Sequence, residues 1–347
     1  MQSQDSTDST TVDPRRALMN RWIETIATRF GLDPATVTTA SNDASFRRYF
    51  RIQASGEARI IMDAPPPQED CRPFVHAAGV LAAAGVSVPE VLAADLEQGF
   101  LLLSDFGNVT YLSRLDPRTA PKLYRDATRA LVTLQQASAP GIFPDYSREL
   151  LSRELALFPE WYLGRHKGVE LSAAQQTVLQ TAFEAILQNN LAQPSIFVHR
   201  DYHSRNLMVL PGDRNPGILD FQDAVYGPIT YDLVSLLRDA YINSEEPQVL
   251  DWTIRYWEAA RAAGLPVAGD FAAFYRDFEW MGLQRHLKVL GIFARLSHRD
   301  GKDNYLKDLP LVLNHVLQVL RRYVDLAPLA RLVEEIEQRK PLAGYTF

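Results

Sequence analysis

The first part of the chain changes from polar residues to apolar residues at helical spacing. Residues 1–13 are rich in Ser, Thr and Asp, which predicts a disordered leader. Apolar side chains then recur at every fourth position, at Leu18, Trp22, Ile26 and Phe30. Because Pro14 favours a helix start and Gly31 a helix stop, this pattern predicts a helix between these two residues.

After Gly31 the pattern changes to short β-like segments separated by turn residues. We expect strands over 36–40, 47–53, 59–63, 88–94 and 100–103. One helix, over 69–84, follows a run of three prolines and ends before Gly85. The segment up to residue 104 therefore reads as a small β-rich lobe.

Helical periodicity dominates the remainder. The predicted helices span 120–137, 148–163, 172–190, 231–242, 247–263, 270–295, 305–322 and 326–338. The only strands we expect here are 196–198, 207–210 and 217–219. The whole pattern predicts an α+β, bilobed protein-kinase-like fold, with an N-lobe over 14–104, a hinge near 104–108 and a mainly helical C-lobe over 105–347.

Composition narrows the classes of function. The chain has 36 Lys and Arg against 42 Asp and Glu, a formal net charge of −6, which argues against a nucleic-acid partner. It has no apolar run long enough to span a membrane and no secretory pattern at its start. Its single cysteine, Cys71, allows neither a disulfide framework nor a thiolate zinc site. We expect a cytoplasmic monomer without membrane or nucleic-acid partners.

Two neighbouring segments carry the candidate chemistry. Residues 199–206 read HRDYHSRN, which has the H-R-D-x-x-x-x-N pattern of a kinase catalytic loop. Phosphoryl transfer needs a carboxylate that orients the acceptor hydroxyl and takes its proton, a role that the pattern gives to Asp201. Residues 217–223 read GILDFQD and place Asp220 after a short apolar strand.

Magnesium, which neutralises the phosphates of ATP, prefers oxygen ligands. Asp220 offers a carboxylate and Asn206 an amide oxygen. We expect the strands over 207–210 and 217–219 to form a hairpin that brings these two side chains together. ATP and Mg²⁺ are therefore the predicted cosubstrate and metal.

Each of these residues also has an ordinary structural interpretation, as a turn former or a helix cap. Their occurrence together, in order and at kinase spacing, favours the kinase interpretation. A zinc hydrolase is a rival, because His199, Asp201 and His203 alternate and could share one strand face. That reading leaves Asn206 and Asp220 without roles.

These motifs resemble the aminoglycoside phosphotransferase and choline kinase-like superfamily. Asp220 is followed almost at once by Gly227 and by Asp232 in a helix start, which leaves no room for a peptide platform and implies a small-molecule acceptor. The resemblance implies that Asp232 supports the backbone of the catalytic loop. It also implies that His199 packs beneath the loop.

Within the superfamily the chain resembles bacterial anomeric kinases for N-acetylmuramic acid and N-acetylglucosamine, which act in peptidoglycan recycling. The residues that carry this likeness are SFRRYFR at 45–51, MDAPP at 62–66 and WMGLQRHLK at 280–288. It implies transfer of the ATP γ-phosphate to the C1 hydroxyl. Another acceptor, such as an aminoglycoside, choline or homoserine, is the alternative within the same class.

The N-lobe departs from the usual kinase pattern. The loop over 41–45 reads SNDAS instead of a glycine-rich sequence, and no lysine stands in the strand over 59–63. An arginine of the second strand could substitute: we predict that Arg48, on the opposite face from Arg47 and Arg51, contacts the ATP phosphates and that Glu69 could pair with it. Without such a cation the chain would be a nucleotide-binding pseudokinase scaffold.

Two more groups of residues complete the predicted site. The hinge over 102–105, with Leu103 and Asp105, is predicted to bind adenine. The candidate acceptor residues are Arg238, Asp239, Glu279, Arg285 and Lys288, all on predicted helices. The carboxylate of N-acetylmuramic acid would suit a cation such as Arg285 or Lys288, whereas aminoglycosides would need an acidic pocket.

Overall fold

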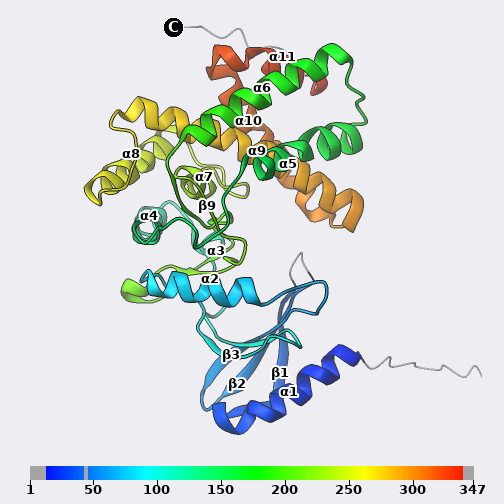
Figure 1. The fold of residues 1–347 in the computed structure, drawn as a ribbon, viewed down its shortest axis with the longest axis vertical. Coiled ribbons are helices and arrows are strands. Elements are labelled where there is room, and N and C mark those ends of the chain that lie inside the picture. The colour runs from blue at the N-terminus through cyan, green and yellow to red at the C-terminus, as the bar shows by residue number, and fades with distance from the viewer. Residues whose placement is uncertain (1–12, 43–45, 339–347) are drawn as a thin grey trace, which may run out of the picture. The chain divides into compact units, whose positions relative to one another are not determined.

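The computed structural model describes residues 13–42 and 46–338, and its chain divides into two compact units. The first comprises residues 1–82 and 88–107, and the second residues 83–87 and 108–347. Residues 1–12 of the predicted leader and 43–45 of the predicted phosphate loop lie outside the described residues. Each unit is described by itself (Figure 1).

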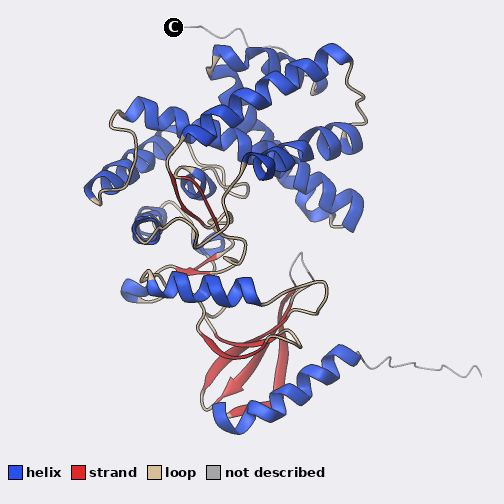
Figure 2. Cartoon of the chain, in the orientation of Figure 1, coloured by secondary structure: helices blue, strands red, loops and turns tan. Residues whose placement is uncertain are grey.

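The first unit is a five-stranded antiparallel sheet with a helix on one face (Figures 1 and 2). Its strands, in the spatial order β1-β2-β3-β5-β4, are β1 (Leu32–Asn42), β2 (Arg48–Ala54), β3 (Glu57–Asp63), β5 (Phe100–Ser104) and β4 (Val91–Asp95). Helix α2 (Arg72–Ala83) follows β3. The β-rich N-terminal unit predicted from the sequence is confirmed.

Helix α1 (Pro14–Phe30) begins and ends where the sequence predicts. The Asp13 carboxylate accepts a hydrogen bond from the Arg15 N–H at 3.0 Å, which caps the first turn. Gly31 ends the helix with a φ of 61°, a left-handed conformation that glycine adopts without strain. The apolar side of α1 packs on the sheet against Phe50, Ile52 and Ile61.

The second unit is mainly helical. Its helices are α3 (Tyr111–Arg114), α4 (Ala120–Gln136), α5 (Arg148–Leu157), the π-helix η1 (Phe158–His166), α6 (Ala173–Ala192), the 3₁₀-helix η2 (Gly212–Arg214), α7 (Tyr231–Leu237), α8 (Glu246–Ala262), α9 (Phe271–Asp300), the 3₁₀-helix η3 (Asp303–Asp308), α10 (Leu309–Arg322), the 3₁₀-helix η4 (Val324–Leu326) and α11 (Ala327–Ile336). Two antiparallel pairs accompany them: β6 (Ser195–Val198) with β9 (Val225–Pro228), and β7 (Leu207–Met208) with β8 (Gly217–Ile218).

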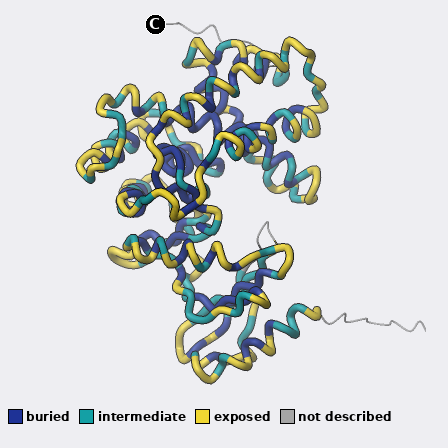
Figure 3. The backbone as a smooth tube through the Cα atoms, viewed as in Figure 1, coloured by how far each residue is buried: buried dark blue, intermediate teal, exposed yellow. Residues whose placement is uncertain are grey.

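Helix α9 forms the centre of this unit. Every residue from Phe278 to Gly291 is buried, the charged ones included (Figure 3). At Gly291 the helix passes the end of α5 so closely that an added Cβ would lie 2.4 Å from the carbonyl oxygen of Leu157. Glycine is therefore required at this crossing. None of the helices in the described ranges has the length and hydrophobicity needed to cross a bilayer.

Several predicted bounds were wrong. The helix expected over 148–163 ends at Leu157 and continues as the π-helix η1, and the helix expected over 231–242 ends at Leu237. In the second case the next residues leave the helix because the Asp239 carboxylate accepts a hydrogen bond from the Tyr241 N–H at 3.0 Å. Strand β9 was not expected, since Gly227 and Pro228 interrupt its apolar pattern.

Candidate active site

The loop over residues 199–206 leaves β6 and is held at its start by a buried carboxylate. Asp232, in the first turn of α7, accepts hydrogen bonds from the backbone N–H of His199 at 2.6 Å and of Arg200 at 3.0 Å. Arg200 has a φ of 76°, in the left-handed region that a non-glycine residue enters only when its surroundings fix it. Asp232 therefore fixes the backbone immediately before Asp201.

A second carboxylate holds the middle of the same loop. Asp239, just after α7, accepts hydrogen bonds from the backbone N–H of Ser204 at 3.0 Å and from the Ser204 hydroxyl. It is only 1% exposed. Helix α7 thus presents one aspartate near each of its ends, and both bind the loop. Contact between Asp239 and an acceptor stays a prediction.

His199 lies beneath the loop with both ring nitrogens facing backbone groups. Its Nε2 lies 3.0 Å from the carbonyl oxygen of Leu219, and its Nδ1 lies 3.2 Å from the backbone N–H of Asp201. These partners require Nε2 to carry the proton and Nδ1 to accept. Burial lowers the pKa of His199 to about 4, so the ring is neutral at pH 7. Neither nitrogen is available to a metal, which argues against the zinc hydrolase.

Asn206 and Asp220 lie side by side, as the predicted hairpin required. In that hairpin Leu207 pairs with Ile218 and Met208 with Gly217. The Asn206 Nδ2 donates to the Asp220 Oδ2 at 3.2 Å and to the Asp201 carbonyl oxygen at 3.1 Å. Asp220 has a φ of 64°.

The donor set at this hairpin fits magnesium. Both hydrogen bonds given above for the Asn206 side chain use Nδ2, so its amide oxygen can face a cation. The Asp220 Oδ1 accepts a hydrogen bond from Gln222 Nε2 at 2.8 Å, which orients the carboxylate. One carboxylate and one amide oxygen, completed by phosphate oxygens, are ligands that Mg²⁺ accepts. Within residues 13–42 and 46–338, no three His, Cys, Asp or Glu side chains group around a possible metal position.

Asp201 is half-buried and surrounded by cations. Burial by itself would raise the pKa of this carboxyl, but Lys288, His203, Arg285 and Arg200 act against it, and the pKa lies below its usual value. Asp201 is therefore ionised at neutral pH. It can accept a hydrogen bond, and then a proton, from a hydroxyl placed against it.

Glu154, on α5, organises these cations and was missed in the sequence. Its carboxylate is 2.6 Å from Arg200 Nη2 and 2.9 Å from Lys288 Nζ, and it accepts a hydrogen bond from the Tyr146 hydroxyl. Although burial would raise the pKa of Glu154, Lys288 and Arg200 lower it. A sequence signal existed: Glu154 lies on the same helical stripe as the buried Leu151 and Leu155.

The predicted acceptor residues divide into two groups. Arg285 and Lys288 lie near Asp201, as their effect on its pKa shows. Arg238 instead pairs with Glu246, and Glu279 pairs with Arg322. A cavity of about 350 Å³ lies between residues 243–246 and α10, and Glu246 lines it. Contact of Arg238 or Glu279 with an acceptor stays a prediction.

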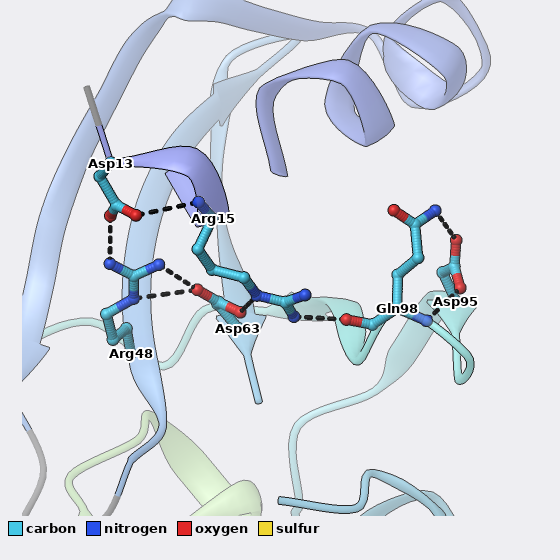
Figure 4. A network of polar contacts seen from close by, with 6 residues as sticks. All are labelled: Asp13, Arg15, Arg48, Asp63, Asp95 and Gln98. Atoms are coloured by element: carbon cyan, nitrogen blue, oxygen red, sulfur yellow. Dashed lines mark hydrogen bonds and ion pairs between the residues drawn. The ribbon is translucent and has the colours of Figure 1, made fainter. Parts of the chain in front are cut away.

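In the first unit, Arg48 lies on the face of the sheet that α1 covers. Its guanidinium binds the Asp63 carboxylate at 2.6 Å and also binds Asp13 (Figure 4). Arg48 and Asp63 are directly opposite each other in the β2–β3 ladder, which explains the pair. These bonds do not test whether Arg48 contacts a nucleotide, so that role stays a prediction.

Two other arginines form separate pairs, Arg47 just before β2 and Arg51 on the face of β2 opposite Arg48. Glu69 pairs with Arg47 at 3.0 Å, and not with Arg48 as we expected. Arg51 binds Asp105 at 2.5 Å, and the Asp105 carboxylate also accepts from the Gly107 N–H at 2.8 Å. Leu103 is buried within β5. Adenine binding by Leu103 and Asp105 stays a prediction.

Residues 36–267 match the model of a family described as “Phosphotransferase enzyme family”. The chain belongs to this family. It is 47% identical over 333 residues to the N-acetylmuramate/N-acetylglucosamine kinase of Pseudomonas aeruginosa, with 94% of this chain and 98% of that relative aligned. It is 49% identical over 339 residues to the protein of the same name from Neisseria meningitidis, with 96% and 99% aligned.

Solved structures of kinases share the fold at low identity. A choline/ethanolamine kinase family protein from Mesorhizobium loti aligns with a TM-score of 0.63 at 16% identity, over 91% of this chain and 99% of that chain. Choline kinase LicA from Streptococcus pneumoniae aligns with a TM-score of 0.59 at 12% identity, over 87% and 99%. The predicted protein-kinase-like fold and the predicted superfamily are confirmed, and the chain is a phosphotransferase.

Proposed function

We propose that the protein is an ATP-dependent kinase that phosphorylates the anomeric C1 hydroxyl of N-acetylmuramic acid and N-acetylglucosamine. The observation that carries the chemistry is the placement of Asp201 next to the Asn206–Asp220 pair, which hydrogen bonds at 3.1 and 3.2 Å hold together. The acceptor class is supported by the names of relatives at 47% and 49% identity. The sugar 1-phosphate would enter peptidoglycan recycling in the cytoplasm.

In the proposed reaction, Asp201 orients the C1 hydroxyl and accepts its proton as the hydroxyl oxygen bonds to the γ-phosphorus of ATP. The bond between that phosphorus and the β,γ-bridging oxygen breaks, and its electron pair leaves with ADP. Asn206 and Asp220 would hold Mg²⁺, which neutralises charge on the phosphates when it is bound. An anomeric hydroxyl is more acidic than an ordinary alcohol, so an ionised carboxylate with a low pKa suffices as base.

Asp232 and Asp239 act in this scheme through the loop backbone. His199 acts in the same way, since its ring ties the Asp201 N–H to the Leu219 carbonyl. These three residues position the reacting carboxylate, and Asp239 is also a proposed contact of the acceptor. Arg48, Leu103 and Asp105 are the proposed nucleotide contacts, and an unchanged Michaelis constant for ATP in Arg48→Ala would remove Arg48 from that group.

The test is magnesium-dependent ADP release with N-acetylmuramic acid, N-acetylglucosamine, glucose, kanamycin, choline and homoserine as acceptors. We expect turnover with the two N-acetyl sugars and a loss of about 10²- to 10⁴-fold in Asp201→Asn. The matched control is Asp213→Asn, a fully exposed aspartate on η2. Phosphate on C1, identified by NMR of the product, separates an anomeric kinase from a 6-kinase. ATP binding without ADP release from any acceptor would indicate the pseudokinase scaffold instead.

A further inference from the structure

Two cations on one face of α9 lie close to Asp201. Arg285 and Lys288 are three residues apart, and both lower the pKa of that carboxyl. Arg285 is 4% exposed and Lys288 is 8% exposed. Both side chains are positively charged, lie on the same helix and are near Asp201, but they differ in their hydrogen bonds and ion pairs.

Lys288 is fully engaged by the protein. Its Nζ lies 2.9 Å from the Glu154 carboxylate and donates to the Tyr231 hydroxyl at 3.1 Å. Glu154 is shared with Arg200, so the buried charge of Lys288 has a counter-ion that is fixed by α5. Nothing about this lysine calls for a ligand.

Arg285 has no such arrangement. In the part of the chain that the structure describes, it forms no hydrogen bond and no ion pair, and its Nη1 is buried without a partner. Its helical neighbours are bonded elsewhere: Gln284 donates to the carbonyl oxygen of Leu151, and His286 bonds the carbonyl oxygen of Arg238. Arg285 lies close enough to Asp201 and Asp232 to lower the pKa of both carboxyls, but it bonds to neither of them.

A buried guanidinium without hydrogen bonds is costly, and a folded protein that keeps one calls for an explanation. Guanidinium has a planar fork of donors that fits an anion with paired oxygens, such as a carboxylate or a phosphoryl group. Two anions of this kind could come near Asp201 in the proposed reaction. One is the phosphoryl group in transfer, and the other is a carboxylate on the acceptor.

The acceptor carboxylate is favoured by the place of Arg285 on α9. Lys288, one turn further along the same helix, binds Glu154, and Glu154 binds Arg200, the residue before Asp201. Arg200 and Asp201 belong to the first half of the loop, where the hydroxyl-bearing substrate must sit, whereas Asn206 and Asp220 form the metal side. N-acetylmuramic acid is N-acetylglucosamine with a lactyl ether that adds one carboxylate.

Resting on the proposed function, we propose that Arg285 is the specificity residue that binds the lactyl carboxylate of N-acetylmuramic acid. Lys288 is a structural cation and does not share this role. N-acetylglucosamine is bound without that contact. One buried arginine therefore sets the preference between two acceptors that share the same reacting carbon.

The test compares kcat/KM for the two sugars in wild type and Arg285→Gln. We expect the ratio of N-acetylmuramic acid to N-acetylglucosamine to fall about ten- to a hundredfold in the variant, because the substitution removes a charge-assisted pair with the substrate. Any loss common to both sugars, through the effect of Arg285 on Asp201, cancels in the ratio. Arg285→Lys keeps the positive charge but loses the planar pair of donors, so its ratio should lie between those of the wild type and Arg285→Gln. Arg276→Gln, on the exposed start of α9, should leave the ratio unchanged.

A second measurement changes the ligand and compares the same two proteins. The methyl ester of N-acetylmuramic acid removes the charge from the ligand, so the wild type should lose a similar factor toward it, and Arg285→Gln should lose little more. An unchanged ratio in an enzyme that turns over both sugars would overturn the inference. Equal losses for both sugars in Arg285→Gln would assign Arg285 to the phosphoryl group or to Asp201 instead. If the proposed function were wrong, the wild type would turn over neither sugar. That result differs from both outcomes above and would also remove the inference.

Discussion

Each unit of the molecule contains a buried carboxylate that binds two cations from distant parts of the chain, but the two clusters hold different elements together. In the first unit the carboxylate is Asp63, which is fully buried. It binds Arg15 of α1 at 2.7 Å and Arg48 of β2 at 2.6 Å (Figure 4). Arg48 also binds Asp13, the cap of α1. This cluster joins a helix to the sheet beneath it.

In the second unit the carboxylate is Glu154. Its cations are Lys288 of α9 and Arg200, and Arg200 lies in the catalytic loop next to Asp201. Both clusters consist of a buried carboxylate bound by two cations. They differ in the part of the chain that carries the cations, because only the second includes a residue of the catalytic loop. Breaking the first should cost stability and, through Arg48, ATP binding, but not the saturated rate, whereas breaking the second should cost stability and turnover together.

Glu154→Ala is expected to have the largest effect. It leaves two buried cations without their shared counter-ion, so the free energy of unfolding should fall by about 3–5 kcal/mol. It also frees Arg200, so turnover per folded molecule should fall at least about tenfold. Urea unfolding and steady-state ADP release measure the two effects, and Glu149→Ala, on the exposed first turn of α5, is the control. Full activity in the folded fraction would make Glu154 merely structural, like Asp63.

Glu154 also shows what could be predicted from the sequence and what could not. Asp201, Asn206 and Asp220 lie within 20 residues of one another, and a local loop and hairpin bring them together, so motif spacing was enough. The two cationic partners of Glu154 are 46 and 134 residues away in the chain. Packing of α5 against α9 brings Lys288 to Glu154, and no local pattern encodes either contact.

The same limit explains the errors in the element bounds. The start and end of α1 were predictable because Asp13, Pro14 and Gly31 act within one turn of the helix. The close passage of Gly291 at the end of α5 was not, because Gly291 lies more than a hundred residues later in the chain. Likewise, no local pattern encodes the hydrogen bond that Asp239, just after α7, accepts from Ser204 in the loop.

Asp232 is a buried carboxylate that forms no ion pair with the described residues, and its pH dependence sharpens the comparison. Burial raises the pKa of Asp232 to about 7, although the N–H groups of His199 and Arg200 oppose the shift. The folded protein therefore binds this proton more tightly than the unfolded chain does. The resulting stabilisation is complete below about pH 4 and is lost as the pH rises through 7.

Asp232→Asn should abolish that dependence. Between pH 4.5 and 7.5 the wild type should lose on the order of 3 kcal/mol of unfolding free energy relative to the variant. His199 has the opposite sign, since its pKa is lowered to about 4, so the difference between the two proteins is the quantity to measure. Parallel curves from urea unfolding at each pH would show that Asp232 is already ionised when folded.

Asp63→Asn tests the other half of the comparison. The amide keeps the shape but removes the charge between Arg15 and Arg48, so we expect a loss of about 2 kcal/mol in unfolding free energy. The rate at saturating ATP and acceptor should stay unchanged, because neither cation belongs to the catalytic loop. Glu57→Gln, an exposed change on β3 in a pair with Arg59, is the control. A fall in the saturated rate would mean that the Asp63 cluster also affects turnover.

The smallest effect is expected at Arg51, on the opposite face of the same strand from Arg48. Its side chain is 21% exposed and has Asp105 as its one carboxylate partner among the ion pairs of the described residues. In Arg51→Gln, Asp105 keeps the hydrogen bond from the Gly107 N–H, so the carboxylate is not left unsatisfied. We expect a loss of about 1 kcal/mol or less, reduced further by 0.5 M salt, as for a partly exposed pair. Urea midpoints at low and high salt measure this. A loss of stability as large as that of Asp63→Asn, and unchanged by salt, would contradict this expectation. Neither the exposure of an ion pair nor the number of cations around its carboxylate would then predict how much the pair stabilises the fold.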